Sequence, residues 1–569
     1  MRWNQTYLLF GHGLWFSFLL ASLPILTLLL LLGVMRKPAW IAGLCGFAVS
    51  LVLALGAYHM PPVLALSAAA NGLAFGLFPI SWIVFWAIAL FRVSVATGQF
   101  EIIKDSIGKL TTDRRLQSLL IAFVFGAFLE GAAGFGTPVA IASTMLIGLG
   151  FTAFDASAAC LLANTAPVAF GSIGIPIVAL AGTTGLSLDK LGAMVGLICT
   201  PMAFIIPFYL IVATTGFGSL SGVFVPTLLT SSVFAGVQLY VSTQIGPQLS
   251  DILASLAAII ALVVYLRVSS RARERASTLY DVWSRKKLTV EDGYEFRETD
   301  RPKEVISISI TNQEAAPVHA TSTLIYAWSP YVLLVLCVLL WGWKPVQTLL
   351  NRVTIPMAWP LLHNMVLRMP PVVPSPVPYH AIFNFNWLAA PGTACMVATL
   401  LSAICLRMKV KDFGCLLLDV MRQLGLPIVT VTSVLALAFL MNYCGATATL
   451  GLGFAATGVM FPFFSAFLGW IGVFLTGSDT SANALFGNLQ VVTATRLGLS
   501  PYLIAAANSS GGVMGKMISL QTIAIAAAAT GLSSQSQTEL FRFTLKHSII
   551  LASVVGCLVL LYCYGLRLS

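Results

Sequence analysis

Charged residues are scarce in this chain. Only 9% of the 569 residues are Asp, Glu, Lys or Arg, whereas a soluble domain carries about 25%. Hydrophobic residues make up 58%, and the mean hydropathy is +0.92. A water-soluble protein has too little polar surface to cover so many apolar side chains. The composition therefore excludes an ordinary soluble domain and indicates a membrane protein.

Signatures of catalysis and of nucleotide binding are also missing. The ten cysteines form no Cys-x-x-Cys pair and the six histidines show no ligand spacing, so we expect neither a disulfide framework nor a metal site. No Gly-x4-Gly-Lys-Ser/Thr sequence supports ATP-driven pumping. A membrane-embedded enzyme would need a nucleophile with a base, or a metal cluster, and the apolar segments offer neither. We expect no enzyme activity and no cofactor.

The net charge of +11 does not indicate a nucleic-acid partner, because the basic residues concentrate in a few loops. Lys and Arg gather in the cytoplasmic loops of membrane proteins. We expect the N-terminus to face out and the basic loops to be cytoplasmic. These loops are Arg36/Lys37, 92–115, 267–303 and 407–411.

Long apolar segments fill most of the chain. Residues 14–34 form an uncharged run of 21 residues, enough at 1.5 Å per residue to cross a hydrocarbon core of about 30 Å. This run is too long for a signal peptide, so we interpret it as a retained first helix. Other apolar segments, such as 117–129 and 484–495, are too short to cross and predict half-helices or re-entrant hairpins. The expected fold is an all-α polytopic membrane protein in a lipid bilayer.

Two short sequences are near copies of one another. Gly-Ala-Phe-Leu-Glu-Gly at 126–131 and Gly-Val-Phe-Leu-Thr-Gly at 472–477 lie 346 positions apart. Each ends an apolar segment at a Gly/Thr/Asn-rich stretch that breaks a helix. The similarity extends to Ala-Asn-Thr at 163–165 and Ala-Asn-Ser at 507–509. Duplicated, interrupted apolar segments are typical of the substrate site of a secondary transporter.

Loop charge gives the orientation of the two copies. Residues 104–115 of the first copy carry four basic residues, whereas the equivalent residues 446–462 carry no charge. By the positive-inside rule these segments lie on opposite sides of the membrane. The sequence therefore predicts inverted repeats, which allow one site to be reached alternately from either face.

Glu130 is one of the few charged residues within the repeats. It lies in residues 129–138, whose three glycines and one proline prevent a continuous helix and leave backbone N–H groups free to face a ligand. A charge at the bilayer centre costs about 2.5–3.5 kcal/mol on insertion scales. One interpretation is a carboxylate that binds and releases a proton during transport, because burial favours the neutral acid. The other is a capping or packing carboxylate held by those N–H groups.

Asp479 occupies the equivalent break of the second copy, residues 477–483, which are dense in hydroxyl and amide groups. It is the second candidate for proton coupling. Ser, Asp and Thr at a helix start are also ordinary N-caps. The two interpretations are compatible, because a helix N-terminus presents free N–H groups and its positive dipole end to an anion.

Lys516 is the one charged residue between Arg496 and Glu539. It is a candidate counter-charge to an anionic substrate or to Asp479; alternatively its side chain snorkels to an interface. Matched polar groups of both repeats complete the predicted site. The candidate substrate-binding residues are Gly131, Gly134, Gly136, Thr137, Asn164, Thr165, Gly477, Ser478, Thr480, Ser481, Asn483, Asn508, Ser509, Ser510 and Lys516.

At these residues the chain resembles the bacterial L-lactate permease family. The matching segments are 126–141, 164–171, 474–481 and 511–519, and the similarity covers nearly the full length. The resemblance implies proton-coupled uptake of L-lactate, and also of D-lactate and glycolate, across the bacterial cytoplasmic (inner) membrane. It further implies an elevator-like fold, in which a mobile transport domain with re-entrant hairpin tips moves against a scaffold. Assembly as a homodimer is left open.

The repeats and the resemblance together divide the chain. Residues 267–326 mix basic and acidic residues without periodicity and predict a cytoplasmic linker. Repeated prolines at 370–378 predict extended backbone in an outer loop. The expected units are scaffold helices 1–62, repeat 1 at 63–241 (transport motifs 126–141 and 163–186), a membrane helix 242–266, the linker 267–326, scaffold helices with the outer Pro-rich loop at 327–411, and repeat 2 at 412–569 (transport motifs 472–488 and 507–532).

Two alternatives stay open within membrane transport. A channel needs no alternating access, and saturable, proton-stimulated counterflow would argue against it. A sodium-coupled transporter of another small carboxylate is the second alternative, because unwound backbone carbonyls with Ser, Thr and Asn side chains also hold Na⁺.

Overall fold

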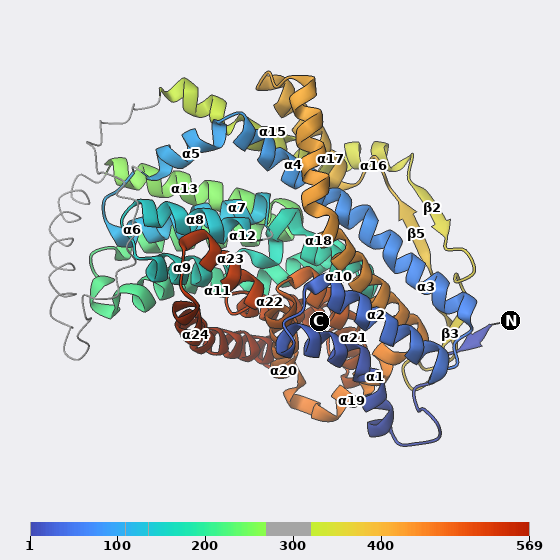
Figure 1. Cartoon of the computed structure of the whole chain (residues 1–569). Helices are drawn as coiled ribbons and strands as arrows, with labels where there is room; N and C mark the ends of the chain where they lie inside the picture. Colours follow the sequence, from blue (N-terminus) through green and yellow to red (C-terminus); the bar gives the residue numbers. More distant parts are fainter. Residues whose placement is uncertain (1, 109, 135, 269–319, 568–569) are drawn as a thin grey trace.

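The computed structural model describes residues 2–108, 110–134, 136–268 and 320–567, and it shows a bundle of helices with small sheets at one end (Figure 1). Twelve helices in these ranges are long and apolar enough to cross a membrane. Two further apolar helices, Thr137–Gly148 and Pro391–Cys405, are shorter. The prediction of an all-α polytopic membrane protein with interrupted helices is confirmed, and the small sheets are an addition to it.

Helix α18 (Val410–Cys444) is the longest in the described chain and organises one group of helices. Its 35 residues span about 52 Å at 1.5 Å per residue, more than a hydrocarbon core needs. Small residues bring its neighbours close: a Cβ on Gly43 would lie 2.4 Å from Ser433 Oγ, and one on Gly72 would lie 2.5 Å from the Leu435 carbonyl oxygen. The other helices of this group are α1 (Leu14–Leu29), α2 (Ala39–Gly56), α3 (Pro62–Phe75), α4 (Trp82–Ala96), α15 (Thr321–Gly342) and α17 (Pro391–Cys405).

The four predicted transport motifs, two in each repeat, lie in helices separated by breaks. Within these motifs α10 packs against α21, and α8 packs against α23, so each repeat contacts the other. The helices are α7 (Gly126–Ala132), α8 (Thr137–Gly148), α9 (Ala153–Ala163), α10 (Gly171–Thr184), α20 (Phe461–Thr476), α21 (Asp479–Leu497), α22 (Pro501–Lys516) and α23 (Leu520–Thr530).

The remaining helices enclose these motifs or connect the groups. Among them α11 packs against α22, α13 against α7, and α24 against α20. They are α5 (Gln99–Gly108), α6 (Arg114–Gln117), α11 (Leu188–Thr215), α12 (Phe224–Gln244), α13 (Ser250–Val268), α16 (Lys344–Asn351), α19 (Ala446–Phe454) and α24 (Ser534–Leu560).

Five short strands lie at the end of the molecule that carries the N-terminus (Figure 1). One sheet has the order β1-β3-β4, with β1 parallel to β3, and the other pairs β2 with β5 in antiparallel register. The Pro-rich stretch contributes strands and turns without a helix, in agreement with its prediction. The strands are β1 (Trp3–Asn4), β2 (Ile355–Ala358), β3 (Val366–Arg368), β4 (Val377–Pro378) and β5 (Ile382–Phe385).

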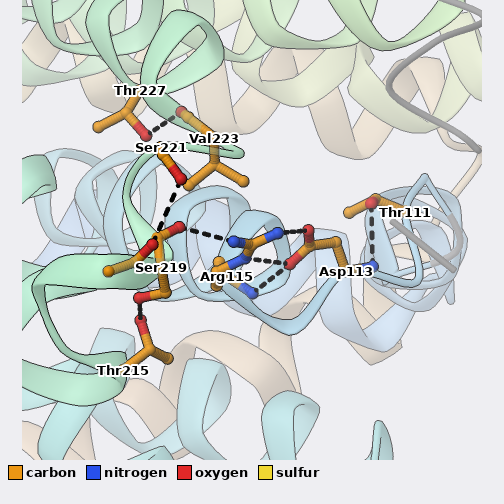
Figure 2. A network of polar contacts seen from close by, with 9 residues as sticks. Thr111, Asp113, Arg115, Thr215, Ser219, Ser221, Val223 and Thr227 are labelled. Carbon is orange, nitrogen blue, oxygen red and sulfur yellow. Dashed lines mark hydrogen bonds and ion pairs between the residues drawn. The ribbon is translucent and has the colours of Figure 1, made fainter. Parts of the chain in front are cut away.

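A buried ion pair fixes the turn that precedes the first transport motif (Figure 2). Asp113 Oδ2 accepts from Arg115 Nη2 at 2.6 Å, and both side chains are less than 9% exposed. Arg115 Nη1 also donates to the Ser219 carbonyl oxygen at 2.6 Å, which ties this turn to the loop between α11 and α12. Arg115, counted among the basic loop residues from the sequence, is thus held inside the fold.

The predicted linker lies mostly outside the described residues. Helix α13 ends at Val268, and α15 begins at Thr321. The apolar segment 501–530 contains a break, because α22 ends at Lys516 and α23 begins at Leu520.

Candidate functional site

The first helix break separates α7 from α8. Gly134 and Gly136 have φ values of 59° and 82°, the left-handed region that glycine adopts without strain. A Cβ on Gly136 would lie 2.5 Å from Ile525 Cδ1, so α23 approaches the backbone of this break closely. The break ends α7 at Ala132, two residues after Glu130, and α8 begins with the Pro138 ring in its first turn.

Glu130 is buried, with 4% of its surface exposed. Its Oε1 lies 2.9 Å from the position that a Cβ on Gly171 would take. Its Oε2 accepts no hydrogen bond from a backbone N–H group of the described residues, and the Asn164 amide lies beside the carboxyl group. The carboxyl group is therefore not held by backbone N–H groups, and the capping interpretation is not what the geometry shows.

The second break lies between α9 and α10, where the chain bends by 67°. Ser172, Ile173 and Gly174 are all left-handed, with φ of 47°, 61° and 75°. A non-glycine residue held there costs on the order of 1–3 kcal/mol and is characteristic of functional sites. Ser172 Oγ donates to the Ala133 carbonyl oxygen at 3.0 Å, which joins this break to the first one.

The third break separates α20 from α21. Gly477 ends α20 with a φ of 71°, and Ser478 caps α21 by accepting a hydrogen bond from the Ser481 N–H at 3.3 Å. Asp479 follows in the first turn. Its Oδ2 instead accepts from Ser509 Oγ at 2.6 Å and from Asn483 Nδ2 at 3.2 Å. Ser478 fills the capping role, so the carboxylate of Asp479 is not the helix cap.

Lys516 ends α22 beside this break and is 8% exposed. Its Nζ donates to the Gly477 carbonyl oxygen at 2.7 Å. No carboxylate of the described chain lies within 4.0 Å of it, yet it interacts electrostatically with both Glu130 and Asp479. The buried position agrees with the deep-cation interpretation and not with snorkelling to an interface.

These breaks converge on a cavity of about 340 Å³, a size typical of small-molecule sites. One wall is polar and comes from the breaks; it includes Glu130, Gly136, Ser172, Gly477, Ser478, Asp479, Thr480, Ser481 and Lys516. A second, mainly apolar wall comes from α1, the residues just after it, α2 and α18. It includes Leu28, Leu32, Trp40, Leu424, Pro427, Val431 and Val434, and its polar members are Gln423 and Thr430. The cavity suits a small anion with a short apolar part.

Comparison with known proteins assigns the family. A sequence profile described as "L-lactate permease" matches residues 17–565. The glycolate permease GlcA of Escherichia coli K12 is 41% identical over 584 residues, covering 99% of this chain and 98% of that protein. The L-lactate permease of Bacillus subtilis 168 is 41% identical over 578 residues, with 98% of each chain covered. The chain belongs to the L-lactate permease family.

Family membership and the twelve apolar helices make this chain a transporter and a multi-pass protein of the bacterial inner membrane. Among solved structures, Neisseria gonorrhoeae MtrF aligns with 95% of this chain at 14% identity, and 97% of that protein is covered. Its TM-score of 0.47 is too low to support an argument about mechanism.

In this family member eight of the predicted residues line the cavity: Glu130, Gly136, Gly477, Ser478, Asp479, Thr480, Ser481 and Lys516. Asn483 and Ser509 lie behind Asp479 and hold its carboxylate, while Asn508 Nδ2 donates to Asn483 Oδ1 at 2.9 Å. Ser510 accepts from Cys199, and the Thr165 hydroxyl donates to the Leu162 carbonyl oxygen. These five residues outside the lining, Thr165, Asn483, Asn508, Ser509 and Ser510, lie behind the polar wall and support it.

The other predicted residues also lie off the cavity lining. Gly131 packs against Asp251, Gly134 against Ser172, and Asn164 lies beside Glu130. Thr137 begins α8 and is partly buried. Gly131 and Gly134 therefore allow neighbouring segments to pack closely. A cluster of glycines in a sequence is as typical of close packing as of a binding site.

Three features of the site were not predicted. Ser172 lines the cavity, although only its flanking glycines at 171 and 174 hinted at a break. The apolar wall from α18 looks like any other apolar helix in the sequence. Asp251, 1% exposed and beside Gly131, stands at the start of an apolar segment, where a charge is typical of an interface.

Proposed function

We propose that this transporter takes up L-lactate together with protons, and that D-lactate and glycolate are further substrates. The names of its relatives support the substrate class, since one is a glycolate permease and others are L-lactate permeases. One observation about the site supports the mechanism. The buried cation Lys516 and the buried acids Glu130 and Asp479 line one cavity of small-molecule size, and Lys516 interacts electrostatically with both acids.

The two walls match a 2-hydroxycarboxylate. The carboxylate requires positive potential, which Lys516 and the N-terminus of α21 supply. The hydroxyl group requires donors and acceptors, which Ser478, Thr480 and Ser481 offer at that N-terminus. The methyl group of lactate faces the apolar wall from α18, and glycolate, which lacks that methyl group, fits the same polar contacts. We therefore assign the polar wall to anion binding and the apolar wall to the side chain.

The charge of the site links lactate to protons. Lys516 with two ionised acids carries one net negative charge, and bound lactate would make it two. An uncompensated buried charge costs several kcal/mol, so one acid must be protonated in the empty site. When the lactate carboxylate pairs with Lys516, the remaining ionised acid loses its counter-charge, so it must be protonated as well. Each lactate therefore binds with one additional proton, which offsets the opposition of the membrane potential, about 2.3 kcal/mol per 100 mV.

Alternating access rests on the two repeats. The sequence match pairs α8 with α21 and α10 with α23. If the two repeats are exchanged, α8 takes the place of α21 and α23 takes the place of α10. The contact between α8 and α23 then corresponds to the contact between α21 and α10, and the structure contains both contacts. A pseudo-twofold relation produces such a pair of contacts, which supports two structurally related repeats, and the loop charges favour their inversion. We propose that the broken helices form the transport domain and that it moves, elevator-like, against the scaffold wall of α1, α2 and α18.

The experiment that tests this function is Glu130→Gln in proteoliposomes. The amide imitates the protonated acid, so lactate counterflow, which needs no net proton movement, should stay within about twofold of the wild-type rate. Accumulation of lactate driven by an imposed pH gradient should fail. Glu101→Gln is the matched control, because Glu101 is exposed on α5, and it should change neither rate. If Glu130→Gln still concentrates lactate in response to the pH gradient, Glu130 is not the proton carrier.

A further inference from the structure

Asp251 is a buried acid that the proposed transport step does not use. It lies in the first turn of α13, where this helix packs against α7, and only 1% of its surface is exposed. A Cβ on Gly131 would lie 3.0 Å from the Asp251 Cβ and 3.0 Å from Ile252 Cγ1. Glycine at 131 thus lets α13 approach α7, and it brings Asp251 next to Glu130.

The hydrogen bonds of Asp251 are incomplete. Gln238 Nε2 on α12 donates to Asp251 Oδ1 at 3.0 Å. Asp251 Oδ2, Gln238 Oε1 and Glu130 Oε2 are buried and lack a hydrogen-bond partner in the part of the chain that the structure describes. A buried acceptor without a donor costs about 1–3 kcal/mol. A proton on one of the two carboxyl groups supplies an O–H donor for these oxygens.

No described cation faces Asp251. Glu130 on α7 interacts with it electrostatically, and Cys199 on α11 lies within reach of its charge. The other elements packed against α13 are α12, whose Tyr240 is exposed, the π-helix Ser118–Phe125 and the 3-10 helix Pro247–Leu249. The last two carry no titratable group. Two buried carboxyl groups close enough to interact electrostatically cannot both be ionised at low cost. A proton must therefore be held by this pair.

We propose that Asp251 is a second proton site, which stores a proton behind Glu130 and exchanges it with that carboxyl group, directly or through one bridging water. The inference rests on the proposed proton coupling through Glu130. In the step, the O–H bond of Asp251 breaks and an O–H bond of Glu130 forms. Asp251 becomes a carboxylate that keeps the hydrogen bond from Gln238, and the reverse transfer restores it. Glu130 thus faces lactate on one side and its proton source on the other.

Asp251→Asn tests the proposal. The amide keeps the size of the side chain and can still accept from Gln238, but it cannot carry a proton. Lactate counterflow should stay within about twofold of wild type, whereas uptake driven by a pH gradient should slow at least tenfold and lose its dependence on pH. Asp419→Asn, at an exposed aspartate of α18, is the control and should change neither rate. Wild-type uptake by Asp251→Asn under the pH gradient would overturn the proposal.

A second pair of variants covers the case in which Asp251→Asn does not fold. Gly131→Ala inserts a methyl group 3.0 Å from Asp251, whereas at Gly126 in the same helix the nearest atom to an added Cβ is 3.5 Å away. We expect Gly131→Ala to impair pH-driven uptake more than counterflow and Gly126→Ala to resemble wild type. Equal loss of both rates in Gly131→Ala would show a purely structural role and overturn the proposal.

The parallel Glu130→Gln experiment separates the two proposals. If Glu130→Gln loses pH-driven uptake but Asp251→Asn keeps it, only the second proton site is overturned. If Glu130→Gln keeps pH-driven uptake, the proposed function fails first. Sodium-stimulated uptake that Asp251→Asn abolishes would also overturn the inference, because the acid pair would then bind a cation and not a proton.

Discussion

Lys516 donates a hydrogen bond from Nζ to the carbonyl oxygen of Gly477, 2.7 Å away. This oxygen belongs to the residue that ends α20, where the negative end of the helix dipole lies. The ammonium group is thereby fixed at the helix break, on the cavity wall and between two acids, without a carboxylate in contact. A cation held by a neutral carbonyl is available to an anionic substrate.

Removal of this cation should weaken binding of the anion. A hydrogen bond to a charged group contributes about 1.5–3 kcal/mol, so Lys516→Ala should raise the lactate Kd at least tenfold. Lys516→Arg should rescue it poorly, since the planar guanidinium does not fit the single carbonyl contact in the same way. Equilibrium binding of radiolabelled lactate to purified protein measures both, with the exposed Lys344→Ala as control. Near-normal affinity in both Lys516 variants would show that backbone dipoles alone hold the carboxylate.

At the third break, substitution of the helix cap Ser478 should mainly lower stability, whereas substitution of the buried acid Asp479 should mainly lower transport. Ser478→Ala removes the capping acceptor of α21 and should lower the free energy of unfolding by about 1 kcal/mol. Asp479→Asn retains an oxygen for the Ser509 hydroxyl and should leave thermal stability nearly unchanged while it lowers transport. Differential scanning fluorimetry and lactate uptake, measured on the same preparations, distinguish the two. A larger fall in Tm for Asp479→Asn than for Ser478→Ala would contradict this assignment.

Gly136 should tolerate no side chain. Its φ is 82°, and a Cβ would lie 2.5 Å from Ile525 Cδ1, so Gly136→Ala should strain the first break and reduce lactate uptake at least tenfold. Gly148 lies in the same helix, with open space around an added Cβ. Gly148→Ala should therefore transport like wild type. If the two variants transport equally well, the close approach of α23 to this break is not required.

The sequence could predict the helix breaks because their causes are local. Glycines at 134, 136 and 477 adopt the left-handed backbone that ends a helix, and Pro138 fits only the first turn of the next one. The rarity of charge within the apolar segments is also visible in the sequence, and it identified Glu130, Asp479 and Lys516 as candidates. The structure places all three on one cavity. These features needed no knowledge of which segments meet in space.

Other features depend on contacts between distant segments and could not be predicted. Asp251 becomes a neighbour of Glu130 only because α13 packs on Gly131, more than a hundred residues earlier. The apolar wall exists because one face of α18 packs toward the broken helices, and the sequence of α18 does not indicate which face this is. Strand β1 forms only because Trp3 pairs with Val366, and two residues carry no pattern that could indicate a strand.

The orientation of the repeats can be tested by labelling. We expect single cysteines at the exposed Asp105 and Thr112, in the segment 104–115, to react with a membrane-impermeant maleimide from the cytoplasmic side. Cysteines at the exposed Ala456 and Thr457, in the segment 446–462, should react from outside. Gln423 lines the cavity, is exposed and accepts a hydrogen bond from Arg92 of a predicted cytoplasmic loop. A cysteine at 423 should therefore react from the cytoplasm, and lactate should protect it. Labelling of both segments from one side would remove the inverted-repeat interpretation.

In the proposed mechanism, a proton gradient drives lactate uptake through this site. Uptake of radiolabelled L-lactate into proteoliposomes, with a proton gradient and a sodium gradient imposed separately at the same membrane potential, tests this coupling. An inward proton gradient alone should concentrate lactate, whereas an inward sodium gradient alone should not. Accumulation driven by sodium in the absence of a pH gradient would contradict this mechanism.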